Sequence, residues 1–559
     1  MPLTFDILFK NGNFWTGDPQ NPSANYIACK DGRIVSISKE KTSSGESEAK
    51  KVIDLRGHFA MPGFIDSHVH LTMGGASLHE IDLRSAKDEC EFAEKVGDYA
   101  KLHGTKWITG GNWDHESWKS PKYPRLRGIL PDLRRDKRLP TKELIDKFTP
   151  STPVFLNRYD THMALVNSYV LRLAGINKDT PDPPGGVIVR DEQGEPTGIL
   201  KDAAREMVLR LVPEPSLEDR IHTTKAALKH ANKLGVTSVH DISFSQDLKT
   251  YEELRRRGEL TARIYSILPI AEYKNLASDG IKVGSGNEWI KTGALKAFAD
   301  GSLGSGTAWF FEPYEDDKTN FGIASDVMSS GELEKWAIDA DRNRLQLAIH
   351  AIGDKAVSRI LDLFEKIQEE NPLWERRFRI EHAQHVRDED FARFKKLNVI
   401  ASVQPYHCID DGRWALEKIG ERRAKTTYAF KRMLDENVSV AFGTDWPVAP
   451  LDPLEGIYAA VSRATLDGKN PDGWVPEQKI SVEQVLKAYT QSSAFASFEE
   501  YEKGTLEVGR LADMVVLSIN PFVVKPAELK HVKVLLTVVG GKVVFADKEF
   551  AEHYEPTAV

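Results

Sequence analysis

Strand-like and helical patterns of hydrophobic residues divide the chain into three parts. Short apolar runs typical of strands lie near both chain ends, at 6–10, 26–30, 33–37, 512–517, 532–539 and 542–545. An Asp-Gly pair at 31–32 and a Gly-Gly pair at 540–541 separate neighbouring runs, as in β-hairpins. Neither end has enough strands to bury a core alone. We therefore predict that residues 1–60 and 505–559 form one small β-sandwich together.

Residues 61–504 instead alternate apolar, strand-like runs with stretches of helical periodicity. The run 234–239 follows a helical stretch at 220–233, and the run 345–349 follows another at 331–342. Repeated β-α units predict a parallel sheet, and about 440 residues suffice for an eight-stranded barrel with inserted loops. We predict an α/β protein, a TIM-like (β/α)8 barrel joined to the sandwich.

The polar stretch 111–153 is the predicted insertion in this barrel. It contains Trp113, Asp114, His115 and a basic run at 134–138, a composition more typical of a lid than of a strand-helix unit. An ordinary surface excursion is an equally good interpretation.

Composition excludes several classes of protein. Hydrophobic residues make up 41% and charged residues 28%, which is ordinary for a globular chain. The net charge is -8 without a long basic block, so nucleic acid is not an expected partner. The first residues lack an uninterrupted apolar core and no run reaches eighteen apolar residues, so we expect a cytoplasmic protein that does not bind membranes. Three distant cysteines fit neither a disulfide framework nor a thiolate zinc site, which leaves histidine and carboxylate as metal ligands.

Two histidines end the most informative apolar run, residues 62–70. His68 and His70 are two positions apart, and a strand directs such residues to the same face. Two neutral imidazoles side by side form half of a zinc site. A His-x-His pair alone is as often coincidental as functional.

Other ligand-type residues also lie at the ends of strand-like runs: Lys296, His350, His382 and Asp445. Taken singly, a buried histidine or a capping aspartate is usually structural. Strand ends on one face of a barrel converge, however, so the whole set in strand order indicates a metal centre.

Six motifs carry a family resemblance across essentially the whole chain, at 62–70, 160–168, 296–304, 350–354, 381–384 and 443–445. Together they resemble the amidohydrolase superfamily, and within it amidohydrolase family 3, the YtcJ-like metal-dependent hydrolases related to N-substituted formamide deformylases. Residues 504–514 resemble the segment that, in this family, connects the end of the barrel to the second part of the sandwich.

The resemblance implies a divalent metal site with one or two ions per chain. In binuclear members a carboxylated lysine, here Lys296, bridges two ions; a substrate-binding or structural ion-pair lysine is the alternative. Zinc suits the ligands best, although iron, manganese, cobalt and nickel are also compatible. The implied ligands of the first ion are His68, His70, Lys296 and Asp445, and those of the second are Lys296, His350 and His382.

The implied reaction is hydrolysis of a carbon-nitrogen bond that is not a peptide bond, in a small-molecule substrate such as an N-substituted formamide or an N-acyl compound. A metal-activated hydroxide would attack, with Asp445 as general base. Asp114 and His162 are candidate substrate contacts, and the rings at 107, 113, 118, 309 and 310 fit either an apolar substituent or the core.

Two alternative functions stay open, a deaminase and a non-catalytic protein. Whether the chain forms a homodimer also stays open. Deaminases of the superfamily typically have a glutamate three residues after the strand-five histidine, where this chain has Gly353. A non-catalytic metal-binding or signalling protein on the same fold is the other alternative.

Overall fold

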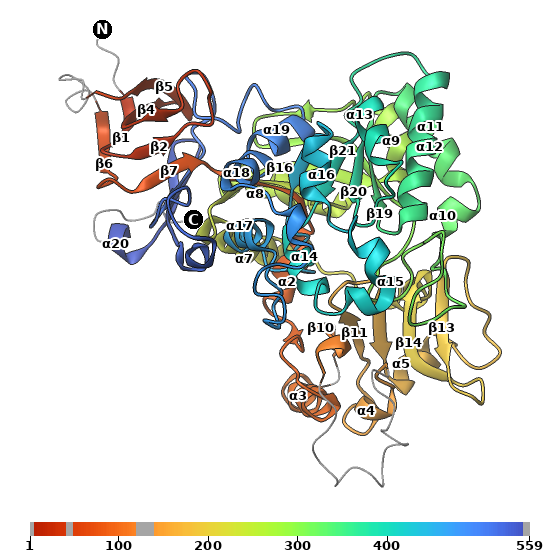
Figure 1. Cartoon of the computed structure of the whole chain (residues 1–559). Coiled ribbons are helices and arrows are strands. Elements are labelled where there is room, and N and C mark those ends of the chain that lie inside the picture. The colour runs from red at the N-terminus through yellow and green to blue at the C-terminus, as the bar shows by residue number, and fades with distance from the viewer. Residues whose placement is uncertain (1–4, 41–48, 105, 119–138, 552–559) are drawn as a thin grey trace. The chain divides into compact units, whose positions relative to one another are not determined.

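The computed structural model describes residues 5–40, 49–104, 106–118 and 139–551 (Figure 1). The chain forms two compact units. The first comprises Met1–Gly75, Leu217–Ala297 and Glu334–Val559, and the second comprises Ala76–Ser216 and Phe298–Leu333.

Both chain ends build the sandwich of the first unit, as predicted. One sheet has the order β5-β4-β1-β6 and the other β25-β24-β23-β7-β2-β3. Its strands are β1 (Phe5–Lys10), β2 (Asn13–Trp15), β3 (Ser23–Ala24), β4 (Tyr26–Lys30), β5 (Arg33–Ser38), β6 (Ala49–Asp54), β7 (Phe59–Pro62), β23 (Met514–Leu517), β24 (Val534–Val539) and β25 (Lys542–Ala546). β23 pairs antiparallel with β7, with Val515 opposite Met61. The core between the sheets mixes side chains of both ends, for example Ile27 and Leu536.

Eight strands form the predicted barrel, in the order β22-β21-β20-β19-β18-β16-β15-β8. They are β8 (Phe64–Val69), β15 (Val236–Ile242), β16 (Arg263–Pro269), β18 (Ile290–Phe298), β19 (Gln346–Ala351), β20 (Arg379–His382), β21 (Ile400–Val403) and β22 (Val440–Phe442). β17 (Ser285–Gly286) adds an antiparallel pair to β18. The first and last strands meet beyond β22, where the Asp445 N–H donates to the His68 carbonyl over 2.7 Å.

Helices follow the barrel strands. They are α2 (Leu71–Ser77), α7 (Leu217–Lys233), α8 (Ser245–Arg257), α9 (Tyr273–Ser278), α11 (Glu332–Arg342), α12 (Asp354–Glu370), α13 (Phe391–Lys396), α14 (Pro405–Asp411), α15 (Ala415–Ala424), α16 (Phe430–Asp435), α17 (Pro453–Ser462), α18 (Val482–Ala488) and α19 (Gln491–Ala496). α12 shows why such segments are helical: Ile360, Phe364 and Ile367 recur every three or four residues and are buried on one face. That face packs against β19.

A buried ion pair joins the barrel to the returning chain within the first unit. Arg263 on β16 donates from Nε and Nη2 to the two carboxylate oxygens of Asp513, over 2.6 and 2.9 Å. Both side chains are almost fully buried. Bidentate pairing fixes the direction in which the chain enters β23.

The second unit is larger than the predicted insertion at 111–153. Its mixed sheet has the order β13-β14-β12-β11-β10-β9, so residues 110–113 form a paired strand and not part of a lid. The elements are β9 (Ile81–Asp82), α3 (Glu89–His103), β10 (Gly110–Trp113), α4 (Glu143–Asp146), β11 (Phe155–Arg158), β12 (Met163–Val166), α5 (Ser168–Leu173), β13 (Gly186–Arg190), β14 (Pro196–Asp202), α6 (Ala203–Leu209) and α10 (Asp326–Ser329). The basic run at 134–138 lies outside the described residues.

Cys29, Cys90 and Cys408 are free thiols. Among the helices that the structure describes, none is both long and apolar enough to cross a bilayer. The cytoplasmic location and the homodimer stay predictions.

Candidate metal centre

All six predicted metal ligands lie at the carboxyl ends of barrel strands. His68, Lys296, His350 and His382 belong to β8, β18, β19 and β20, while His70 and Asp445 directly follow β8 and β22. Five of the six are buried, and the His70 side chain is 21% exposed. Because the strands are parallel neighbours, their ends meet on one face of the barrel.

Asp445 lies between two imidazoles. Its Oδ1 is 3.5 Å from His68 Nε2 and 3.3 Å from His70 Nε2. One ligand atom each from His68, His382 and Asp445 lie within 4.8 Å of one another. The His382 ring is also 4.5 Å from the His350 ring, between centroids. The structure therefore brings the histidines and Asp445 together, whereas the division of ligands between two ions stays a prediction.

Hydrogen bonds orient the imidazoles. The Nδ1 of His68 bonds to Glu381 Oε2 over 2.5 Å, and the Nδ1 of His382 bonds to Gln404 Oε1 over 2.8 Å. The Nε2 atoms are thereby left for the centre of the site. His68 Nε2 is buried and has no hydrogen-bond partner within the described ranges. A buried nitrogen in this state fits a divalent ion, which can accept its lone pair.

Glu381 belongs to a fully buried charge network. Burial alone would raise its pKa, but Arg379 and His68 hold the pKa of Glu381 below its usual range. Arg379 donates from Nε to Glu381 Oε1 over 2.7 Å, and its other donors reach Ser402 Oγ and His240 Nδ1, both over 2.9 Å. His240 thus has a structural partner in this network.

Two of the candidate ligands have an unusual backbone conformation. His382 and Asp445 have φ angles of 71° and 63°, in the left-handed region that costs free energy for residues other than glycine. Asp66 holds the backbone just before Asp445 in place, because its carboxylate accepts hydrogen bonds from the backbone N–H and the Oγ1 of Thr444, over 2.9 and 2.6 Å. A Cβ at Gly443 would lie 2.5 Å from the backbone nitrogen of His68, so only glycine allows the two strands to approach this closely.

Lys296 is 4% exposed on β18. Burial, with a smaller effect of Arg379, lowers the pKa of Lys296 to about 8, although Glu381 and Asp445 act in the opposite direction. A larger fraction of the amine is therefore neutral than in an exposed lysine, and the neutral form is the one that reacts with carbon dioxide.

Sequence reasoning missed three residues of the site. His407 on α14 has its Nε2 3.9 Å from Asp445 Oδ2, and its ring stacks over that of His382 at 6.3 Å. Its position four residues after β21 is close to the strand-end position that identified the other candidate ligands. Glu381 belongs to the motif at 381–384 but was given no role. Gln404 directly follows β21, but glutamine is not a typical metal ligand, and only the fold brings it to His382.

The two predicted substrate contacts belong to the second unit. Asp114 is buried, caps the short helix at 115–117 and lies 3.9 Å from Arg158. His162 Nδ1 bonds to Asp202 Oδ1 over 2.6 Å. Although burial lowers the pKa of His162, the bond to Asp202 and the charge of Asp160 leave it raised. Of the aromatic rings, Trp113 is fully buried and donates to the Leu156 carbonyl, which makes it core.

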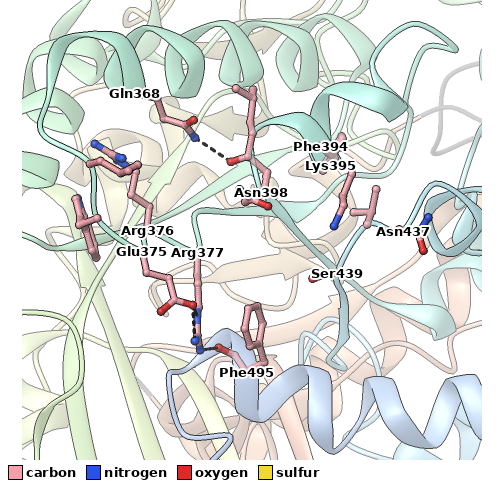
Figure 2. A pocket seen from close by; sticks show the side chains of 15 residues that line it. Gln368, Glu375, Arg376, Arg377, Phe394, Lys395, Asn398, Asn437, Ser439 and Phe495 are labelled. Atoms are coloured by element: carbon pink, nitrogen blue, oxygen red, sulfur yellow. Dashed lines mark hydrogen bonds and ion pairs between the residues drawn. The ribbon is translucent and has the colours of Figure 1, made fainter.

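A pocket of about 300 Å³ in the first unit lies at the opposite ends of β20–β22 (Figure 2). Its residues at 373–377, 397–399 and 437–439 precede these strands. Arg377 is fully engaged there, with Glu375, Glu500 and the Phe495 carbonyl as acceptors. The side chains of this pocket thus link the segments that lead into β20–β22, on the barrel face opposite the candidate metal centre.

A parallel barrel with histidines and an aspartate at its strand ends defines a metal-dependent hydrolase. The family model of the amidohydrolase family matches residues 51–545, and the chain therefore belongs to the amidohydrolase family. The resemblance found in the sequence is confirmed.

Relatives and a solved structure agree with this assignment. The chain is 38% identical to Protein LONG AFTER FAR-RED 3 of Arabidopsis thaliana (97% of this chain, 91% of the relative). It is 32% identical to the putative amidohydrolase YtcJ of Bacillus subtilis (91% and 92%) and 26% identical to the N-substituted formamide deformylase of Arthrobacter pascens (96% and 97%). A crystal structure of an uncharacterized metal-dependent hydrolase from Pyrococcus horikoshii OT3 matches with a TM-score of 0.73 at 31% identity, over 93% of this chain and 99% of the other.

Proposed function

We propose that the chain hydrolyses a carbon-nitrogen bond other than a peptide bond, in an N-substituted formamide or a related N-acyl compound. The position of Asp445 between imidazoles at the strand ends carries this proposal. The relative named as an N-substituted formamide deformylase aligns over nearly its whole length and supports the substrate class.

The residues fit a divalent ion, with zinc as the best match to imidazole and carboxylate ligands. His68, His382 and Asp445 would supply ligands, and His70, Lys296 and His350 would complete the set for one or two ions. When bound, such an ion supplies Lewis acidity, which polarises a carbonyl and makes water more acidic.

Asp445 would move the proton. Burial alone would raise its pKa, but the neighbouring imidazoles of His68, His70 and His407 hold the pKa of Asp445 below its usual range. The carboxylate is therefore ionised at neutral pH and can accept a proton at Oδ2, the oxygen that faces His407. It would then donate that proton to the leaving nitrogen.

A deaminase is the less favoured enzyme. Deaminases of the superfamily typically have a glutamate three residues after the strand-five histidine. This chain has Gly353 at that position, the N-cap of α12, which has no side chain to donate a proton.

Elemental analysis before and after chelation tests the proposal. We expect purified protein to contain one or two equivalents of metal and to release amine from a small N-substituted formamide, such as N-benzylformamide. A chelator should abolish the release and the metal should restore it. Protein that contains no metal and stays inactive after supplementation would favour the non-catalytic alternative.

Replacing Lys296 with alanine is expected to remove at least one equivalent of metal per chain, because in the binuclear arrangement Lys296 would be a ligand of both ions. Lys291→Ala is the matched control, since Lys291 lies on the same strand but pairs with Glu499 at 3.6 Å. Metal content measured by mass spectrometry should fall only in the first variant. Equal metal content in both variants and in the native protein would refute the bridging role.

A further inference from the structure

His407 is an imidazole at the candidate metal centre to which the proposed reaction gives no role. It belongs to α14, and its side chain is 12% exposed. Its Nε2 atom is buried and has no hydrogen-bond partner among the residues that the structure describes. Leaving a buried polar atom unpaired costs free energy, so a molecule that enters the site is the expected partner.

The segment that carries His407 holds its ring in place. Gln404, just before α14, accepts a hydrogen bond from His382 Nδ1 over 2.8 Å. Cys408 and Ile409 are buried, and α14 packs against α17. The ring of His407 lies nearly parallel to that of His382, at an angle of 13°. The imidazole therefore has a fixed position beside the candidate ligands.

His407 and the other imidazoles face different oxygens of Asp445. Oδ1 lies 3.5 Å from His68 Nε2 and 3.3 Å from His70 Nε2, whereas Oδ2 lies 3.9 Å from His407 Nε2. A separation of 3.9 Å is too long for a hydrogen bond. In the described parts of the chain, His407 does not belong to the cluster of ligand atoms that lie within 4.8 Å of one another. Its position suits contact with a substrate better than binding of the ion.

The carboxylate of Asp445 favours one tautomer of His407. A negative oxygen near Nε2 attracts a polar N–H, so the neutral ring carries its proton on that nitrogen and acts there as a donor. The atom that gives its proton to Asp445 Oδ2 is the atom that attacks the carbonyl carbon of the substrate, and the carbonyl oxygen is then two bonds away from it. A donor beside Oδ2 is therefore within reach of that oxygen.

We propose that His407 is a catalytic residue whose Nε2–H donates a hydrogen bond to the carbonyl oxygen next to the bond that is cleaved, an inference that rests on the proposed function. This oxygen gains negative charge when water adds to the carbon, so the hydrogen bond is stronger in the transition state than in the bound substrate. His407 forms no covalent bond, and its proton stays on Nε2. Such a donor suits an acyl C–N bond, because every acyl group supplies the oxygen.

Three substitutions of His407 separate the donor from the shape of the ring. Phenylalanine keeps a ring without the N–H, glutamine places an amide N–H at the reach of Nε2, and asparagine carries the same amide on a shorter chain. On N-benzylformamide, His407→Phe and His407→Asn should lower kcat by a factor of about 10² to 10³, with KM and metal content nearly unchanged. His407→Gln should lower kcat by less than about tenfold. His531→Phe is the matched control, because His531 is exposed at the end of the short helix Pro526–His531, and it should keep native kinetics.

Three results would overturn the role of His407. Native kcat in His407→Phe excludes a part in the reaction. An equal loss of kcat in the phenylalanine, asparagine and glutamine variants shows that the N–H is not what matters. Loss of metal from these variants makes His407 a ligand of the ion instead. Circular dichroism checks the fold of each variant, and the comparison of glutamine with asparagine decides if the phenylalanine variant does not fold.

Calorimetric titration with methylphosphonate separates this inference from the proposed function. The tetrahedral oxygens of methylphosphonate resemble the adduct of water with a carbonyl group, and its binding to the metal-loaded full chain needs no turnover. We expect His407→Phe to weaken this binding by a factor of about 10, and His407→Gln and His531→Phe to leave it nearly unchanged. Absence of turnover on N-benzylformamide in native protein contradicts the proposed function. Equal methylphosphonate affinity in native protein and His407→Phe, or no binding to native protein, contradicts the role of His407.

Discussion

Asp445→Asn should lower kcat/KM by a factor of about 10² to 10⁴, the range for removal of a general base, while the protein stays folded. The amide keeps the shape of the carboxylate and one oxygen for the site, but it cannot accept the proton. Kinetics on N-benzylformamide, with the metal content measured on the same sample, distinguish loss of the base from loss of the ion.

Asp452→Asn is the control for this variant. Asp452 follows the same barrel strand and caps α17 by accepting from the Leu454 N–H, a bond that asparagine also makes. It should retain activity. Full activity of Asp445→Asn with normal metal content would exclude Asp445 as the base.

Glu381→Gln is expected to weaken metal binding by a factor of about 10 to 100, because Glu381 fixes which nitrogen of His68 faces the site. It should also lower the free energy of unfolding by about 3–5 kcal/mol, because Arg379 would keep a fully buried charge without a carboxylate. Metal dissociation constants and urea midpoints measure the two effects separately.

Asp341→Asn separates positioning from stability. Asp341 pairs with buried Arg376 over 2.8 Å, in a part of the barrel that contains no metal ligand. The variant should be destabilised to a similar degree and should bind metal normally. If Glu381→Gln binds metal as tightly as Asp341→Asn does, Glu381 is a structural residue only.

The sequence predicted which strand-end residues would gather on one face of the barrel better than it predicted their surroundings. Their positions follow from a local rule, because an apolar run predicts a strand and a parallel barrel gathers the strand ends. His407 obeys the same rule and was overlooked. Gln404 and the role of Glu381 depend on which side chains meet across the barrel, and periodicity along one strand carries no such information.

The second unit was the main difference from the predicted fold. Residues 76–216 contain strands as apolar as those of the barrel, such as Met163–Val166, so their pattern reads as more barrel units. Their pairing is mixed, with antiparallel β11-β12 and β12-β14. Strand direction is set by tertiary connections, which the hydrophobic pattern does not encode.

The joint sandwich also constrains how the chain is made. β7 pairs with a strand about 450 residues further along, so on the ribosome this edge of an early sheet waits until almost the whole protein has been synthesised. Until then the unpaired backbone N–H and C=O groups of β7 can form hydrogen bonds with strands of other chains. A chain that stops before residue 514 would thus lack a central strand of the sandwich, and we expect it to aggregate and not to persist as a shortened hydrolase.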